Sequence, residues 1–249
     1  MNVIKNKIFG YSKFQDAEEI PRLNFNVKFS RSAYQGEKLH PALEALLYYI
    51  YTEGRMDPLC PFAFNNADEM RIKILLAKLK SGGWKSLDEK IISPVIAMAA
   101  IQEYLKSLPK SLWSSTQPED WKTLAKILRD RDQSTDIESK SMYNSRMEAL
   151  KIFKNFTPDV RNFSAKLLMT LHEVMIHCDE DLQAAAAHRL SEFFAEALIK
   201  NPEKIINQTP MTFQFCVAYL IEEAPFVFGS EDALIQPSPN TTYKSTNSL

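Results

Sequence analysis

The sequence predicts an all-α protein, and three observations favour that class. Apolar residues recur at positions i, i+3, i+4 and i+7 in segment after segment, which places them on one face of a helix. No run of alternating apolar and polar residues is strong enough to build a sheet. The 249 residues include only six glycines, which disfavours a nucleotide-binding α/β fold. We therefore expect a single bundle of about eight or nine helices.

Four helices are expected in the first half of the chain. The third has the clearest signals, because Ser93 is a natural N-cap and Pro94 fits the first turn, where its missing N–H costs nothing. Pro109 ends that helix, while Gly54 and the glycine pair 82–83 end the first and the second. The helices are expected over residues 41–54, 66–79, 94–108 and from Pro118 onward, with a core-facing set of Leu43, Leu46, Leu47, Ile50, Ile72, Leu75, Leu76, Leu79, Met98, Ile101, Leu105, Leu108, Trp121, Leu124 and Leu128.

Four more helices are expected in the second half. The charged stretch Arg129–Ser141 has no apolar period, and we expect it to be a solvated, flexible loop. The fifth helix then leads to Phe153, Thr157-Pro158-Asp159 caps the sixth, the seventh covers about 181–199, and Thr209-Pro210 caps the eighth. The core-facing set in these helices is Val160, Phe163, Leu167, Leu171, Val174, Leu190, Phe193, Phe194, Ala197, Leu198, Met211, Phe215, Leu220 and Ile221.

One helical domain is expected over residues 37–228, because no linker-like composition interrupts it. Residues 1–36 show only short extended pieces and are expected to be irregular. The composition of 229–249 turns to Ser, Thr, Pro and Asn, which predicts a disordered tail.

Charge and apolar content exclude several classes of partner and location. The chain has 30 Lys and Arg residues against 31 Asp and Glu, so no global attraction to nucleic acid or to an anionic membrane is expected. The longest apolar run, Val95–Ile101, is far shorter than the roughly 20 residues that cross a bilayer. Three widely spaced cysteines, Cys60, Cys178 and Cys216, and an N-terminus without the apolar core of a signal peptide predict a cytoplasmic protein with free thiols and no membrane insertion.

A search for catalytic and metal-binding motifs gives no candidate. His172 and His177 look like a zinc-protease pair, but they lie at i and i+5, about 140° apart around a helix, where one ion cannot bind both. The sequence contains no phosphate-binding loop, no Gly-x-Gly-x-x-Gly and no Gly-x-Ser-x-Gly. We expect neither a metal nor a cofactor.

A motif in the third expected helix is more specific. The run Tyr104-Leu105-Lys106-Ser107-Leu108-Pro109-Lys110-Ser111-Leu112 resembles the central signature of Rho GTPase-activating (RhoGAP) domains, Leu-Lys-x-(aromatic)-Leu-Arg-x-Leu-Pro-x-Pro-Leu. The family's lysine falls on Gln102 and its arginine on Lys106. Weaker similarities at Ile8-Phe9-Gly10, 40–54, 66–79, 147–175 and 207–228 extend the resemblance over about residues 8–228. The resemblance implies a RhoGAP-like helical bundle.

The resemblance also implies that the surface with which RhoGAP domains contact the GTPase has changed in this chain. Its arginine finger falls on Phe62, in a loop that Pro58 and Pro61 stiffen. In the family this arginine neutralises charge on the transferring phosphoryl group, worth roughly 10³–10⁵ in rate; Phe62 has no charge and no hydrogen-bond donor. Family asparagines fall on Gln183 and Arg189. The implied GTPase-binding residues are Phe62, Gln102, Lys106, Lys110, Gln183 and Arg189, with no catalytic residue among them.

The function that the resemblance implies is signal transduction without catalysis. The chain is expected to be a RhoGAP-like regulator or binding module, a pseudoenzyme that docks a Rho-family small GTPase without accelerating GTP hydrolysis. Two alternatives stay open. In one, the chain is an active GTPase-activating protein that uses Arg55, Arg71 or Arg189. In the other, it is a scaffold that no longer binds GTPases and serves other signalling proteins.

Overall fold

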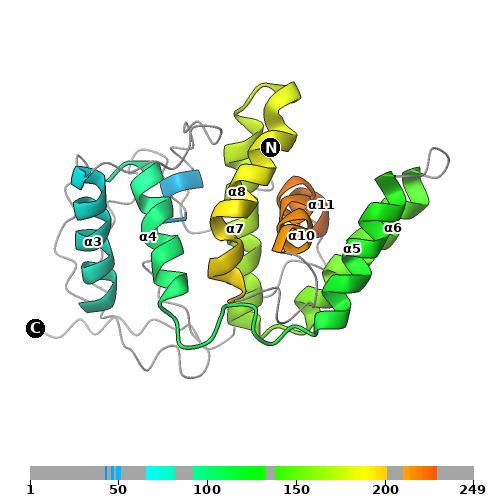
Figure 1. The fold of residues 1–249 in the computed structure, drawn as a ribbon, viewed down its shortest axis with the longest axis horizontal. Helices are drawn as coiled ribbons and strands as arrows, with labels where there is room; N and C mark the ends of the chain where they lie inside the picture. Colours follow the sequence, from blue (N-terminus) through cyan, green and yellow to red (C-terminus); the bar gives the residue numbers. More distant parts are fainter. Residues whose placement is uncertain are drawn as a thin grey trace, which may run out of the picture.

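Helices are the only regular secondary structure in the part of the chain that the structure describes (Figure 1). The computed structural model describes residues 43, 46, 47, 49–51, 66–81, 92–132, 138–200 and 210–228. These ranges contain no strand, so the predicted all-α class is confirmed, and none of their helices is long and apolar enough to span a membrane. The elements are α3 (Asn66–Ser81), α4 (Pro94–Lys106), α5 (Pro118–Asp132), α6 (Glu138–Lys154), α7 (Pro158–Ile176), the 3₁₀ turn η4 (Glu180–Leu182), α8 (Gln183–Leu198), α10 (Pro210–Glu222) and α11 (Ala224–Phe228).

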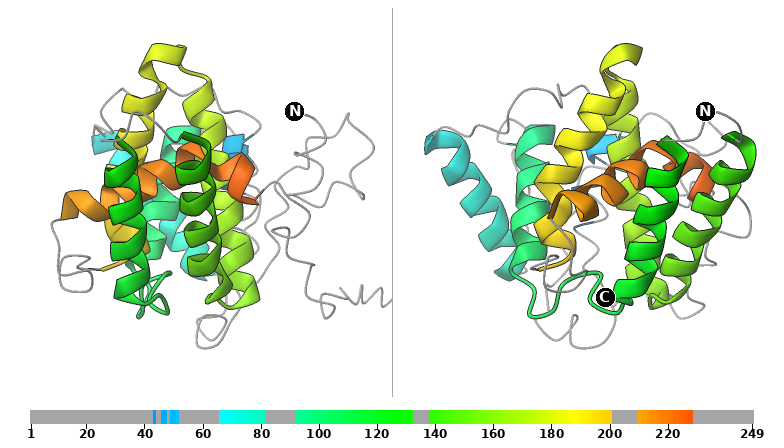
Figure 2. Two further views of the ribbon diagram at one scale, coloured as in Figure 1. Left: turned by 90° about the vertical axis from the view of Figure 1, so that its right-hand side faces the viewer. Right: turned by 45° about the vertical axis from the view of Figure 1, so that its right-hand side comes forward.

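The helices pack in pairs, and α10 crosses between them. In Figure 1, α3 lies beside α4 on one side of the molecule and α5 lies beside α6 on the other, with α7 and α8 in the middle. Both views in Figure 2 show α10 running across these upright helices, and it packs on α8, α5 and α7. The core therefore joins segments that are far apart in the sequence, including α4 and α8, whose contact builds the candidate site.

Aromatic side chains fill a large part of the core. Trp113 and Trp121 stack with ring centroids 5.4 Å apart, and Phe213 meets both rings edge-on. The indole nitrogen of Trp113 donates to the hydroxyl of Ser164 at 2.8 Å, and that of Trp121 donates to the hydroxyl of Thr116 at 2.9 Å. An unpaired buried donor costs about 1–3 kcal/mol, so these two bonds allow both tryptophans to be fully buried.

The predicted core-facing positions are buried with few exceptions. Leu43, Leu46, Leu47 and Ile50 from the first expected helix are at most 1% exposed. The remainder of that helix lies outside the described residues, as do the segments 1–36 and 229–249. Among the other predicted positions, a half-buried set comprises Leu76, Val160, Phe193 and Phe215, and the side chains of Leu79 and Met211 lie outside the described residues.

The signature helix starts where the sequence predicts and ends earlier. The hydroxyl of Ser93 accepts a hydrogen bond from the backbone N–H of Ile96 at 3.3 Å, which confirms the N-cap. α4 ends at Lys106 rather than at residue 108, because the residue before a proline is disfavoured in the helical region. The helix is buried on nearly every side, from Ile96 through Gln102, and not only on the single face that its periodicity predicts.

The prediction of a loop over Arg129–Ser141 is wrong at both ends. α5 continues to Asp132 and α6 begins at Glu138, which leaves 133–137 between them, outside the described residues. Charged residues such as arginine, lysine and glutamate are good helix formers. Helix ends that project into water need no apolar face, so the missing apolar period in this stretch did not indicate a loop.

The last two expected helices are each divided. The 3₁₀ turn η4 occupies the start of the segment expected as one helix over 181–199, and α8 begins at Gln183. The final helix breaks at Glu223 into α10 and α11. At the start of α7, Thr157 has the extended backbone of an N-cap, but its side chain forms no capping hydrogen bond.

Candidate functional site

The candidate site centres on the contact between α4 and α8, because these two helices and the turn after α4 carry the described GTPase-binding residues that the resemblance implies. Gln102 lies inside this contact. It is 8% exposed, and its side-chain amide donates a hydrogen bond to the backbone carbonyl of Phe193 on α8. The structure therefore gives Gln102 an internal position that joins the two helices, and a direct contact of this side chain with a partner stays a prediction.

Two lysines mark the C-terminal end of α4. The Nζ atom of Lys106 lies 3.5 Å from a carboxylate oxygen of Glu103 one turn earlier, with about a third of the Lys106 side chain exposed. Lys110 is exposed on the turn that follows the helix. Both cations therefore face water within a short distance along the chain.

Gln183 and Arg189, the two predicted residues on α8, lie closer to the start of α8 than Phe193 does. Gln183, at its first position, donates to the carbonyl of Cys178 at 3.3 Å. Arg189 is 62% exposed and lies 3.3 Å from a carboxylate oxygen of Glu192. At a rise of about 1.5 Å per residue, Gln183 is about 15 Å along the axis from Phe193, the residue that meets Gln102. The predicted residues thus form two groups, with Lys106 and Lys110 after Gln102 at and beyond the end of α4, and Gln183 and Arg189 before Phe193 on α8.

The predicted arginine-finger position, Phe62, and the alternative Arg55 both lie outside the described residues. Arg71, which the sequence offers as a substitute finger, is exposed on α3 and pairs with Asp68 on the same helix at 3.4 Å. The part of the prediction that concerns catalysis therefore stays a prediction.

The turn after α4 is tied to the end of α8 by three hydrogen bonds. The backbone N–H of Trp113 donates to the carbonyl of Leu198 at 3.0 Å. The backbone N–H of Lys200 donates to the hydroxyl of Ser111 at 2.8 Å, and its ammonium donates to the carbonyl of Leu108 at 2.5 Å. The sequence analysis missed Lys200 and Ser111, because nothing in local spacing links residues that lie about 90 positions apart.

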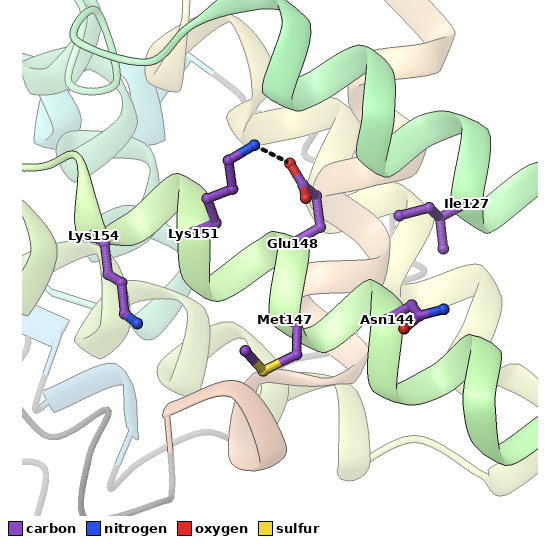
Figure 3. Close-up of a pocket in the computed structure, with 6 residues that line it drawn as sticks. All are labelled: Ile127, Asn144, Met147, Glu148, Lys151 and Lys154. Atoms are coloured by element: carbon purple, nitrogen blue, oxygen red, sulfur yellow. Dashed lines mark hydrogen bonds and ion pairs between the residues drawn. The ribbon is translucent and has the colours of Figure 1, made fainter.

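A groove lies away from this contact, along α6 (Figure 3). This groove of about 470 Å³ is lined by Ile127, Asn144, Met147, Glu148, Lys151 and Lys154. Lys151 lies 2.9 Å from a carboxylate oxygen of Asp120 and 3.1 Å from one of Glu148, and these partners raise its pKa. Because its charge is already matched by two carboxylates, this lysine is poorly suited to binding an anion.

No metal-binding group occurs among the described residues, where no three potential ligands cluster. His172 on α7 is half-buried, and its Nδ1 lies 2.9 Å from the carbonyl oxygen of Ile221. A carbonyl only accepts, so Nδ1 carries the proton. Burial lowers the pKa of His172, and burial raises the pKa of the Cys216 thiol to about 12. A thiol with so high a pKa is protonated and unreactive.

Comparison with known proteins identifies the fold. No protein-family model matches the chain, and no curated protein matches its sequence. A solved structure with a similar fold is the BH domain from GRAF, the GTPase regulator associated with focal adhesion kinase. The TM-score is 0.51 and the sequence identity is 14%, over 76% of this chain and 93% of that domain. At this identity the likeness concerns the fold alone, which is the all-α, RhoGAP-like bundle that the sequence predicts.

Proposed function

We propose that this chain is a binding module for Rho-family small GTPases that docks its partner without accelerating GTP hydrolysis. The observation that supports this most is that two independent indications agree. The motif over residues 104–112 resembles the RhoGAP signature, and the fold is similar to a domain of GRAF, which is named as a GTPase regulator.

The exposed cations of α4 and α8 suit a protein-docking face. Lys106 and Arg189 are held by carboxylates one turn away, and such surface pairs are typically worth only about 0–1 kcal/mol. A partner carboxylate can therefore replace Glu103 or Glu192 at little cost. Electrostatic complementarity of this kind raises the association rate and the specificity of docking.

Within this proposal, the two glutamines hold the helices in place and need not contact the partner. Gln102 holds α4 against α8 through the Phe193 carbonyl, and Gln183 binds the carbonyl of Cys178 at the start of α8. Both side chains fix the helices that present the charged residues, so their contribution to docking is one of position.

The proposed lack of catalysis rests on Phe62. A phenyl ring cannot neutralise the charge that develops on the phosphoryl group, and an arginine supplied there is worth roughly 10³–10⁵ in rate. Phe62 instead offers an aromatic side chain, a residue type that frequently anchors protein interfaces.

Two measurements with the full chain test the proposal. Rho-family GTPases loaded with a non-hydrolysable GTP analogue should bind it at micromolar concentrations or below. Single-turnover GTP hydrolysis should rise by less than about tenfold when the chain is added, because no arginine finger is supplied.

Other results would support the alternatives. A larger acceleration favours an active GTPase-activating protein, and the variants Arg55→Ala, Arg71→Ala and Arg189→Ala would then show which arginine acts. No retention of any Rho-family GTPase at micromolar concentrations favours a scaffold that serves other signalling proteins.

A further inference from the structure

The turn that follows α4 presents Lys110 between two buried anchors. Leu108 and Leu112 are 4% and 2% exposed, whereas Pro109 and Lys110 between them are exposed. The buried leucines fix the two ends of this loop, and a further restraint comes from another segment of the chain.

Lys200 supplies that restraint from both sides of the tip. Its ammonium donates to the carbonyl of Leu108, and its backbone N–H donates to the hydroxyl of Ser111. These two acceptors flank the exposed pair Pro109-Lys110. A single residue, Lys200, which follows α8, therefore clasps the turn that follows α4.

The ammonium also suits its position electrostatically. Leu108 lies just beyond the C-terminus of α4, where unpaired carbonyls carry the negative end of the helix dipole and favour a cation. A hydrogen bond from a charged donor to such a carbonyl is stronger than one from a neutral donor. A side chain of the same length without the charge would keep the packing and lose the bond.

We infer that Lys200 is a positioning residue for GTPase docking, which acts by holding the turn that carries Lys110. The inference rests on the proposed function, since it names a residue that shapes the same face. Lys200 itself need not touch the partner, because its ammonium is already engaged by the Leu108 carbonyl.

The test compares three variants of the full chain for binding to a Rho-family GTPase loaded with a non-hydrolysable GTP analogue. Lys200→Met removes the ammonium and should weaken binding by about five- to twentyfold, since it removes a hydrogen bond from a charged donor. Lys200→Arg keeps a charged donor and should bind within about twofold of the wild type. Lys126→Met removes an exposed lysine from α5 and serves as the matched control, with unchanged affinity.

A double-variant cycle separates positioning from direct contact. If Lys200 acts through Lys110, then Lys200→Met should change the affinity by less than about twofold in a Lys110→Met background. Independent, multiplying losses would overturn the inference, because they mark a contribution of Lys200 that does not pass through Lys110. An unchanged affinity of Lys200→Met would overturn it as well.

Hydrogen exchange keeps this test distinct from that of the proposed function. The amides of Trp113 and Ser114, which donate to the carbonyls of Leu198 and Ser111, should exchange at least about fivefold faster in Lys200→Met than in the wild type or in Lys126→Met. If exchange is faster in Lys200→Met but the wild-type chain binds no GTPase, the proposed function is overturned, and the docking role of Lys200 with it. The hydrogen bonds from Lys200 to the turn would still be established in that case. Unchanged exchange would overturn the clasp whatever the binding result.

Discussion

The side chain of Gln102 on α4 donates a hydrogen bond to the backbone carbonyl of Phe193 on α8. The glutamine stands where the resemblance places a lysine in RhoGAP domains, and it is only 8% exposed. A neutral amide can be buried against a helix carbonyl at low cost, whereas an ammonium in the same place would have to leave water. The change of residue type and the buried position are thus physically consistent.

Gln102→Lys should therefore destabilise the bundle. We expect the free energy of unfolding to fall by about 2–3 kcal/mol, because a charge enters a nearly closed site. Gln102→Met, which removes only the hydrogen bond, should cost about 1 kcal/mol. Urea denaturation measures both values. The control Ala185→Lys places the same charge on an exposed position of α8 and should change stability by less than about 0.5 kcal/mol. A Gln102→Lys variant as stable as the wild type would show that the residue is not buried in solution.

Leu105→Asp should prevent the domain from folding. Leu105 is 0% exposed in the core cluster, and a carboxylate there would be buried without a cation beside it. We expect the cooperative thermal transition to disappear, since the loss exceeds about 4 kcal/mol. Differential scanning calorimetry checks this, with Ala185→Asp as the exposed counterpart. An unchanged melting temperature would refute the placement of α4 in the core.

The stability of the protein should fall in mild acid through His172. Burial lowers the pKa of this histidine, so the folded state holds it neutral at pH values where the unfolded chain begins to protonate it. Its contribution is complete above the ordinary histidine pKa of about 6.5 and is lost as the pH falls through the lowered folded-state pKa. In that window the free energy of unfolding falls with a slope of at most about 1.4 kcal/mol per pH unit.

The variant His172→Asn isolates this effect, because an amide donor can replace Nδ1–H and does not titrate. Denaturation curves between pH 7.5 and pH 5 should lose this part of the slope in His172→Asn and keep it in His177→Asn, which changes an exposed histidine at the end of the same helix. Equal slopes in the wild type and His172→Asn would contradict the prediction.

Phe62→Arg should not restore much GTPase activation. The arginine would sit in a loop stiffened by Pro58 and Pro61, and the positions of the family's other polar residues carry Gln102, Gln183 and Arg189. We expect single-turnover hydrolysis to rise by less than about tenfold, against the roughly 10³–10⁵ of a correctly placed finger. A gain of several hundredfold would mean that the rest of the face is intact.

Local signals in the sequence predicted much of the fold. Ser93 and Pro94 fixed the start of α4, and the 3.6-residue period predicted most of the buried apolar positions that it named on α7 and α8. It did not predict that α7 is buried at every residue from Phe163 through Leu171. The burial of α4 on nearly every side also had a local signal, because Ala97, Ala99 and Ala100 make its other sides apolar. The prediction considered only the face with the larger apolar residues and therefore missed it.

Contacts between distant segments could not be predicted in the same way. The sequence around Gln102 predicts a surface residue, and only the contact of α4 with α8 buries it. Lys200 likewise finds its two acceptors only where the end of α8 meets the turn after α4. The same limit applies to the site as a whole. A resemblance assigns residues to a face, but the distances between them depend on how the helices cross.

The stacked indoles of Trp113 and Trp121 give this protein an intrinsic optical reporter. Both rings are 0% exposed, so their fluorescence should be emitted at shorter wavelength than that of tryptophan in water. Exposure of the pair when the bundle opens shifts the emission to the red, and a Trp84→Phe background removes the signal of the third tryptophan in the sequence. Because the two rings belong to segments that meet α7 and α10 in the core, loss of packing at either contact can be followed by light without attaching a dye.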